Sequence, residues 1–216
     1  MGTETAFDYL TPEHRLRMID SSKRLQYEFG GVFDAATIDR FLRTSYDAFA
    51  DHADNEVYAP AFAERFARVR LRALVAIDAK DADSVPIVLF LSTHNSSRSQ
   101  MAAAYFHQMV EDRAVTWSGG LHPDAELNPE IVSAMADEGI DISGSLPKPW
   151  DNEIIRAADV IVTLGCADRV PVFPGRQYLD WEIPDPGTAD ADRIRTVRDD
   201  VKARVRALVD DLELGG

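Results

Sequence analysis

The sequence predicts an α/β fold: a small parallel sheet flanked by helices, preceded by a small three-helix bundle. Residues 1 to about 80 show only helical patterns, whereas short apolar strands alternate with helices after Pro86. Such strand–helix alternation is typical of a parallel sheet covered by helices. We therefore divide the 216 residues into a bundle at 1–80 and an α/β domain at 85–216, joined by a polar linker at 78–84.

The N-terminal bundle is predicted from helix signals and apolar spacing. Thr11-Pro12 is a helix start, because a hydroxyl N-cap is followed by proline at the first helical position, and Gly30-Gly31 ends this helix. Asp34 is expected to cap a second helix, and a third is expected from about Ala59. Three amphipathic helices with short joins favour an antiparallel bundle. The apolar stripe expected on the first helix is Leu16, Ile19, Leu25 and Phe29.

The C-terminal domain is predicted from four short apolar segments separated by helical ones. The helix near residue 128 opens with Asn-Pro-Glu, and the last helix carries an apolar stripe from Ile194 to Leu208. Ligands of such folds lie beyond the carboxyl ends of the strands. The strands are expected at 87–91, 114–117, 160–164 and 177–181, and the helices at 98–111, 128–138, 152–157 and 188–212.

Composition excludes several classes of function. The chain has 23 Lys and Arg against 37 Asp and Glu, a net charge of −14, which disfavours nucleic acids and anionic membranes as partners. No apolar stretch approaches the roughly 20 residues of a membrane helix, and no signal peptide is recognisable, so we expect a cytoplasmic protein. Cys166 is the only cysteine, so no internal disulfide can form, and the histidines lack metal-ligand spacing. We expect no metal.

The most informative stretch is a polar loop between the first strand and the next helix. It reads Ser92-Thr93-His94-Asn95-Ser96-Ser97-Arg98-Ser99. A loop in this position aims its N–H groups at one point, and the helix adds the positive end of its dipole. Arg98 supplies planar donors for a tetrahedral oxyanion, Asn95 can brace the loop, and Ser99 can donate to position 92. Residues 93–99 are therefore predicted to bind an oxyanion, although a plain polar turn would use similar residues.

Position 92 decides what such a loop can do. A cysteine there would feel the positive potential of the loop, so its pKa would fall and it would become a thiolate nucleophile. A serine hydroxyl is too weak an acid to ionise in the same field. It would need a neighbouring general base, and the sequence indicates none.

The domain after Pro86 resembles the low-molecular-weight protein tyrosine phosphatase fold, and most closely the arsenate reductases built on it. The matching stretches occur in the family's order over more than half of the chain. The helical bundle resembles an extension attached to some actinobacterial members. The stretches are "VLFLSTHNSSRSQMAAA", "WSGG", "LNPEIVSAMADEGIDIS", "AADVIVTLGCAD", "VPVFPG" and "DWEIPDP".

This resemblance implies reduction of arsenate to arsenite, a step of arsenic detoxification. A loop nucleophile at position 92 would attack arsenate held by the loop and Arg98, and Asp185 would act as general acid. Cys166 matches a second cysteine that attacks the first. The resemblance implies no bound cofactor but an external thiol reductant, thioredoxin or mycothiol, delivered by a redox partner protein. Without the resemblance, Asp185 could equally be a carboxylate in a turn. Cys166 could equally be a small buried residue.

The sequence departs from the family pattern at three positions. Ser92 stands at the nucleophilic cysteine, Val170 at a third cysteine found in many members, and Ala103 at a glutamate that helps hold potassium in some. If Val170 replaces a cysteine, the parent enzyme would be thioredoxin-coupled. If Val170 is original, a parent with cysteines at 92 and 166 would favour a small thiol such as mycothiol.

Three functional hypotheses follow. The first is an arsenate reductase whose nucleophile is replaced by Ser92, so that this form binds oxyanions but is inactive. The second takes Ser92 at face value: a non-catalytic phosphate- or arsenate-binding regulatory module whose bundle passes the signal to a partner. The third, a phosphotyrosine phosphatase, is disfavoured by the reductase-like flanks of the loop and by Cys166.

Overall fold

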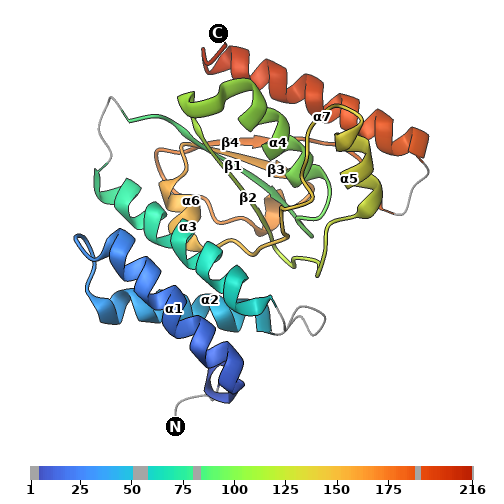
Figure 1. The fold of residues 1–216 in the computed structure, drawn as a ribbon. Coiled ribbons are helices and arrows are strands. Elements are labelled where there is room, and N and C mark those ends of the chain that lie inside the picture. Colours follow the sequence, from blue (N-terminus) through green and yellow to red (C-terminus); the bar gives the residue numbers. More distant parts are fainter. Residues whose placement is uncertain (1–4, 51–57, 80–83, 188–190, 216) are drawn as a thin grey trace. The chain divides into compact units, whose positions relative to one another are not determined.

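The computed structural model describes residues 5–50, 58–79, 84–187 and 191–215 (Figure 1). The chain forms two compact units, Met1–Lys80 and Asp81–Gly216. Each unit has its own hydrophobic core. No helix in these described stretches is long and apolar enough to cross a membrane.

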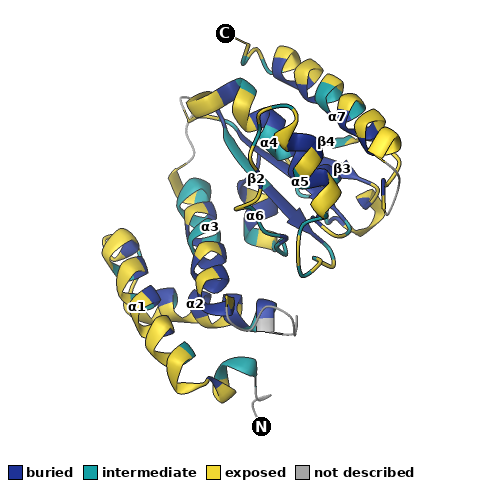
Figure 2. Ribbon diagram, turned by 45° about the vertical axis from the view of Figure 1, so that its right-hand side comes forward, coloured by how far each residue is buried: buried dark blue, intermediate teal, exposed yellow. Residues whose placement is uncertain are grey.

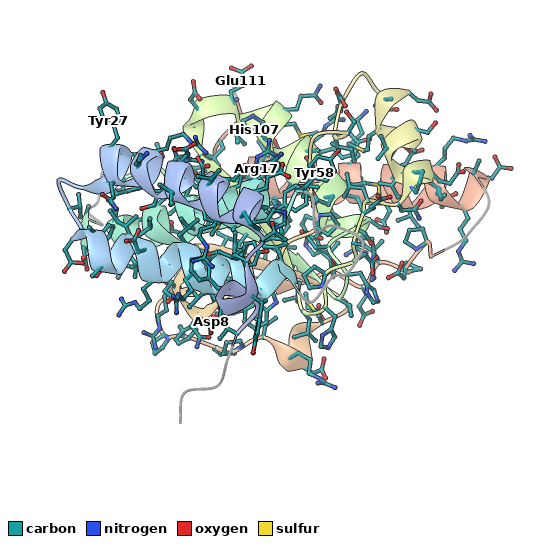
Figure 3. All side chains as sticks on the ribbon, turned by 60° about the horizontal axis from the view of Figure 1, so that its bottom comes forward. Asp8, Arg17, Tyr27, Tyr58, His107 and Glu111 are labelled. Carbon is teal, nitrogen blue, oxygen red and sulfur yellow. The ribbon has the colours of Figure 1, made fainter. Side chains whose placement is uncertain are left out.

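The N-terminal unit consists of helices, as the sequence predicts. A 3₁₀ turn, η1 (Ala6–Tyr9), precedes α1 (Pro12–Phe29), α2 (Ala35–Ala50) and α3 (Ala59–Ala79). The Thr11 side chain accepts the His14 N–H and caps α1, and Asp34 Oδ1 accepts the Thr37 N–H at 2.7 Å at the start of α2. The side chains of Tyr27 and Tyr58 project from this unit and are 95% and 60% exposed (Figure 3).

The buried face of α1 differs from the predicted one. Leu16 and Ile19 are 66% and 47% exposed, so the predicted stripe is wrong at these two positions. The buried positions are Met18, Ser21, Leu25 and Phe29. A polar contact selects this face, because Ser21 donates to the buried carboxylate of Glu64 on α3 at 2.7 Å. The predicted linker at 78–84 also begins too early, since α3 continues to Ala79; residues 80–83 lie outside the described ranges.

The C-terminal unit contains a four-stranded parallel sheet in the order β2-β1-β3-β4. The strands are β1 (Ile87–Ser92), β2 (Val115–Gly120), β3 (Val160–Leu164) and β4 (Gln177–Asp180). The central strands β1 and β3 are buried along their whole length. The second strand runs three residues past the predicted range 114–117, and its last residue, Gly120, pairs with Ser92.

Helices cover both faces of this sheet, as predicted (Figures 1 and 2). The four helices are α4 (Arg98–Val110), α5 (Pro129–Ala136), α6 (Asn152–Ala157) and α7 (Ala191–Asp211), with 3₁₀ turns η3 (Glu111–Arg113) and η4 (Ala167–Arg169). Residues of α4, α5 and α7 share one core with Val88 and Phe90 of β1. Successive strand residues alternate between faces, so Leu89 and Leu91 are directed to the other side, where α6 lies. Part of the predicted last helix, residues 188–190, falls outside the described ranges.

Candidate active site

The predicted loop lies at the carboxyl end of the sheet. Ser92 is the last residue of β1, where it pairs with Gly120 of β2 and Leu164 of β3. Residues 93–97 form the loop, and α4 begins at Arg98. Gly120 allows this arrangement because a side chain there would come within 2.9 Å of the Asn95 Cβ. The sheet thus presents the loop at the edge where such folds bind ligands.

A neighbouring segment holds the carbonyl side of the loop. The N–H groups of Leu121, His122, Asp124 and Asn128 donate to the carbonyl oxygens of Ser92, Thr93, His94 and Ser96, at 3.2, 2.7, 3.0 and 3.1 Å. Within the described residues, the backbone N–H groups of His94, Ser96, Ser97 and Arg98 have no protein acceptor. Because the carbonyls are held on one side, these free donors can serve an anion on the other.

The Ser92 hydroxyl lies inside the loop. Its Oγ is 2.8 Å from the Ser99 Oγ and accepts the Asn95 N–H at 3.1 Å. Asn95 has a left-handed backbone (φ 50°) and its Nδ2 donates to the Ser99 Oγ at 2.9 Å. All three residues are buried. These contacts would stabilise a thiolate at position 92, but no imidazole or carboxylate of the described residues is hydrogen-bonded to Ser92 as a base.

Two further residues brace the loop, and the sequence analysis assigned a role to neither. The Gln100 Nε2 donates to the Asn95 carbonyl and side-chain oxygens at 3.0 and 3.1 Å and to the Leu146 carbonyl. The Lys148 N–H donates to the Asn95 Oδ1 at 3.0 Å, and its Nζ donates to the Ser118 Oγ at 2.9 Å. Gln100 directly follows the loop, so its role could be predicted from its position in the sequence. Lys148 lies 53 positions from Asn95, beyond any local pattern.

Arg98 and Asp185 meet at the mouth of the site. The Arg98 side chain is 7% exposed; its Nη2 donates to the Asp185 Oδ2 at 2.5 Å and its Nη1 to the Ile183 carbonyl at 2.8 Å. Gly165 makes room for this guanidinium. Its φ is 79°, and a side chain there would lie 3.2 Å from the Arg98 Nη1. The arginine is therefore fixed by two segments distant in sequence, the turn at Gly165 and residues 183–185.

Cys166 lies next to this arginine but is closed off from solvent. The residue follows β3 and is 2% exposed. Burial raises the pKa of its thiol, and a backbone hydrogen bond from Leu164 and the charge of Arg98 offset only part of this effect. Val170, where the family resemblance leads us to expect a third cysteine, is also buried. Cys166 is therefore a protonated thiol at neutral pH.

A cavity of about 270 Å³ opens onto the loop. Loop residues in its wall are Ser92, His94, Ser96, Ser97 and Arg98, and Asp185 faces them. Asp124 and Glu126 add acidic groups to the rim. The Asp124 carboxylate accepts the Ser96 hydroxyl at 2.5 Å and lies 3.2 Å from the His94 Nδ1. Asn95, Ser99 and Cys166 are not part of this wall. The described residues contain no group of three or more His, Cys, Asp or Glu suited to a metal ion.

Comparison with known proteins agrees with this architecture. Residues 87–214 match the family model described as low molecular weight phosphotyrosine protein phosphatase, and residues 19–75 match the N-terminal domain of protein-tyrosine-phosphatase-like proteins. A thioredoxin-dependent arsenate reductase of Corynebacterium glutamicum superposes with a TM-score of 0.84 and 34% identity, over 93% of this chain and 98% of that one.

Relatives without the helical unit match the second half of the chain. The arsenate reductase of Bacillus subtilis is 35% identical over 129 residues, 56% of this chain and 92% of the relative. A glutaredoxin arsenate reductase of Synechocystis is 34% identical over 56% of this chain and 95% of the relative. An arsenate reductase in the phosphate binding state is 32% identical, with a TM-score of 0.53 over 58% and 98%.

The chain therefore belongs to the low molecular weight phosphotyrosine protein phosphatase family. This confirms the family resemblance and the predicted fold. The relatives named above are arsenate reductases, and this chain groups with them by family.

Proposed function

We propose that this chain carries an arsenate reductase site without its nucleophile, which binds arsenate or phosphate and does not reduce it. The observation that carries the proposal is the environment of Ser92. Its Oγ occupies the position between the Asn95 N–H and the Ser99 hydroxyl at the base of a loop with free N–H donors. A thiolate would be stabilised there, whereas a hydroxyl without a base is not activated.

Binding would use the loop at 93–99, in which His94, Ser96, Ser97 and Arg98 line the cavity while Asn95 and Ser99 hold the loop in shape. The free N–H groups and the start of α4 favour a tetrahedral anion, and the arginine adds charge-assisted donors. Asp185 now occupies one edge of the guanidinium, so an entering anion competes with this carboxylate. The 270 Å³ cavity suits a small oxyanion better than a large phosphorylated substrate, which disfavours the phosphatase alternative. The carboxylates of Asp124 and Glu126 at its rim oppose the entry of any anion, and the loop donors have to outweigh them.

Reduction becomes possible on the same scaffold when position 92 is cysteine. The Ser92→Cys thiolate would attack arsenic and form a sulfur–arsenic bond, while Asp185 would protonate the departing oxygen so that it leaves as water. A second thiol would then attack the sulfur at position 92. A disulfide forms, the bond to arsenic breaks with its electron pair, and arsenic(V) leaves as arsenite.

The electrons would come from an external thiol system. A structural neighbour is thioredoxin-dependent and a relative is named as a glutaredoxin arsenate reductase, which supports a redox partner protein without selecting one. Cys166 is the second thiol that the chain itself offers, and its burial means that the segment after β3 must open before it reacts. With Ser92 in place, one cysteine cannot form an internal disulfide.

Calorimetric titration of the purified chain with phosphate and with arsenate tests the binding part of this proposal. We expect one site per chain, and a loss of affinity of at least about tenfold in Arg98→Lys, because lysine lacks the planar donor set. Arg206→Gln, an exposed residue of α7, is the matched control and should bind normally. Failure of the unaltered chain to bind either anion would contradict the proposal.

The regulatory module remains as a second candidate, favoured by Ser92 itself and by the helical unit. In this case residues 1–80 and 85–216 would act as separate domains, and anion binding at the loop would alter the first. Hydrogen exchange of residues 5–50 with and without phosphate distinguishes the two. Altered protection in α1 and α2 supports the module, and unaltered protection supports a disabled reductase with a stabilising extension.

A further inference from the structure

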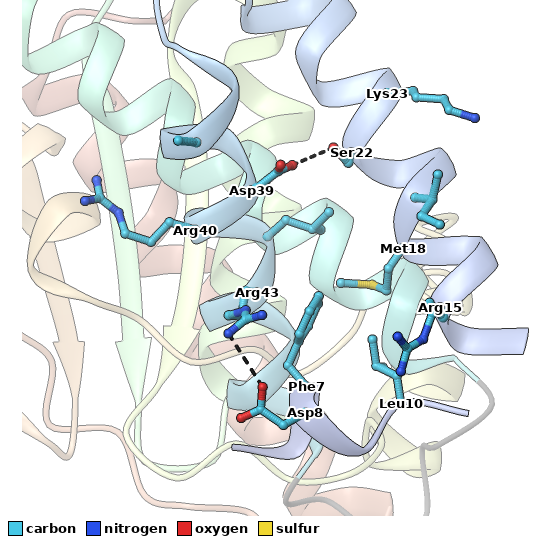
Figure 4. Close-up of a pocket in the computed structure, with 13 residues that line it drawn as sticks. Phe7, Asp8, Leu10, Arg15, Met18, Ser22, Lys23, Asp39, Arg40 and Arg43 are labelled. Carbon is cyan, nitrogen blue, oxygen red and sulfur yellow. Dashed lines mark hydrogen bonds and ion pairs between the residues drawn. The ribbon is translucent and has the colours of Figure 1, made fainter. Parts of the chain in front are cut away.

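A second, larger cavity lies within the N-terminal helical unit, between α1 and α2, with η1 at one end (Figure 4). Its volume is about 620 Å³. Cavities of roughly 300–1,000 Å³ lined mainly by apolar side chains are the usual sites for small molecules. The residues in its wall come only from this unit, so the cavity is separate from the loop at Ser92.

The floor of this cavity is apolar. Leu10, Met18 and Leu42 are buried at its base, and Phe7 and Ile19 complete the wall. Ile19 is 47% exposed, so this apolar side chain is open to solvent next to the other apolar groups of the cavity. Covering this surface with the apolar body of a ligand would be favourable, at roughly 25 cal/mol per Å² of apolar area removed from water.

The rim of the cavity is cationic in a chain that is strongly acidic overall. Four basic side chains, Arg15, Lys23, Arg40 and Arg43, stand around it against two carboxylates, Asp8 and Asp39.

The two carboxylates are already engaged. Asp39 accepts the Ser22 hydroxyl at 2.5 Å. Asp8 accepts the Thr5 N–H and lies 3.6 Å from an Arg43 nitrogen (Figure 4).

Two of the cations form no close ion pair, although hydrogen bonds from Thr37 and the charge of Arg40 together lower the pKa of the Asp34 carboxylate. Among the described residues, no carboxylate oxygen lies within ion-pair distance of the Arg15 or Arg40 guanidinium. Arg15 extends from α1 beside Leu10, whereas the Arg40 side chain leaves α2 in the direction away from α1, and its guanidinium lies 5.6 Å from the centroid of the Phe41 ring (Figure 4). The cavity thus combines an apolar floor with the positive charge of Arg15 at its rim and that of Arg40 on its outer side.

We propose that this cavity binds a small amphipathic organic anion: an apolar body against Met18, Ile19 and Leu42, and one anionic head at the basic rim. The occupant is a free molecule and not a membrane lipid, because the net charge of −14 repels anionic surfaces and the cavity has the size of one small ligand. This binding requires neither the loop nor an inorganic oxyanion. It therefore stands independently of the function proposed above.

Octanoate and octan-1-ol are matched probes, because they share a chain and differ in the charge of the head. Each is titrated into the ¹⁵N-labelled full chain while backbone amide shifts are followed. We expect saturable shifts in residues 15–23 and 36–43, and octanoate binding about fivefold more tightly than octan-1-ol, since each exposed ion pair contributes up to roughly 1 kcal/mol. Phosphate at saturating concentration should not displace octanoate.

Variants separate the two parts of the cavity. Arg15→Gln combined with Arg40→Gln should abolish the preference for octanoate, whereas Arg206→Gln, outside this unit, should keep it. Ile19→Gln, at an exposed position that the fold tolerates, should weaken both probes equally. Absence of saturable shifts with octanoate, or equal binding of both probes to the unaltered chain, would overturn the proposal. Sedimentation with anionic phosphatidylglycerol vesicles but no binding of monomeric octanoate would overturn it in favour of a membrane surface.

Discussion

The Arg98 Nη2 and the Asp185 Oδ2 lie 2.5 Å apart, although 87 positions separate the two residues in sequence. The group expected to hold the oxyanion is thus paired with the group expected to act as general acid. Arg98 is almost fully buried, and the carboxylate of Asp185 is 47% exposed. In the free protein, the Asp185 carboxylate therefore occupies part of the Arg98 guanidinium, to which the oxyanion would bind.

Removing the charge of Asp185 separates these two roles. We expect Asp185→Asn to raise the affinity for phosphate about threefold, because a competing carboxylate at a half-exposed pair contributes no more than roughly 1 kcal/mol. In the Ser92→Cys background, the same change should lower arsenate turnover, since the general acid is lost. Calorimetry and a coupled assay measure the two effects. Asp168→Asn, an exposed carboxylate on η4, is the control, and parallel changes of both readouts would contradict this assignment.

Gly165 should matter for the site beyond its backbone conformation. Gly165 and Gly175 both have left-handed backbones, with φ of 79° and 76°, but a side chain at Gly165 meets Arg98 whereas one at Gly175 meets nothing within 4 Å. We expect both alanine variants to lose about 1 kcal/mol of unfolding free energy. Only Gly165→Ala should also weaken phosphate binding. Equal phosphate affinities of the two variants would show that Gly165 does not position Arg98.

Lys148 predicts a pH dependence of anion binding. Burial lowers the pKa of its ammonium to about 8, and the same residue braces Asn95. Affinity for sulfate, whose charge is constant in this range, should fall as pH rises through about 8, because the positive charge that Lys148 holds at Ser118 of β2 is lost. Lys148→Met should flatten this profile. The pKa of Lys148 is lower in the folded protein than its unfolded value of 10.5. Below about pH 8 the buried ammonium therefore lowers the free energy of unfolding. This destabilisation disappears as pH rises from about 8 to 10.5.

Glu64 predicts the acid stability of the helical unit. Burial alone would raise its pKa, but hydrogen bonds from Arg24, Ser21 and Arg68 outweigh this and lower it to about 2. The ionised Glu64 therefore stabilises the helical unit fully above about pH 4.5, and this stabilisation is lost as pH falls toward 2. Glu64→Gln should lower the free energy of unfolding by about 2 kcal/mol at pH 7. Breaking a fully buried ion pair would cost more, but Arg24 is half exposed. Circular dichroism during acid titration, with the exposed Glu13→Gln as control, measures this.

Most elements of the fold could be predicted because their signals are local. Thr11 and Pro12 start α1, Asp34 caps α2, and the apolar run before Ser92 forms a buried strand. The side of α1 that faces the core could not be predicted. It depends on Ser21 meeting Glu64, a contact between residues 43 positions apart.

The candidate site shows the same division. The loop itself was recognisable from its sequence between a strand and a helix, and the structure brings Ser92, Asn95 and Ser99 into contact. The groups that fix this loop were not recognisable. Lys148 and Asp124 reach it from distant segments, and the pairing of Arg98 with Asp185 requires the whole sheet to be in place.

The most direct test of the central claim is arsenate reduction by two proteins, this chain and Ser92→Cys. NADPH consumption is followed with thioredoxin and its reductase, and separately with mycothiol and its redoxin. We expect turnover only in the Ser92→Cys protein, with the effective donor identifying the redox partner. Turnover by the serine form at a comparable rate, or no turnover by the Ser92→Cys form although it binds arsenate, would show that Ser92 is not what disables this site.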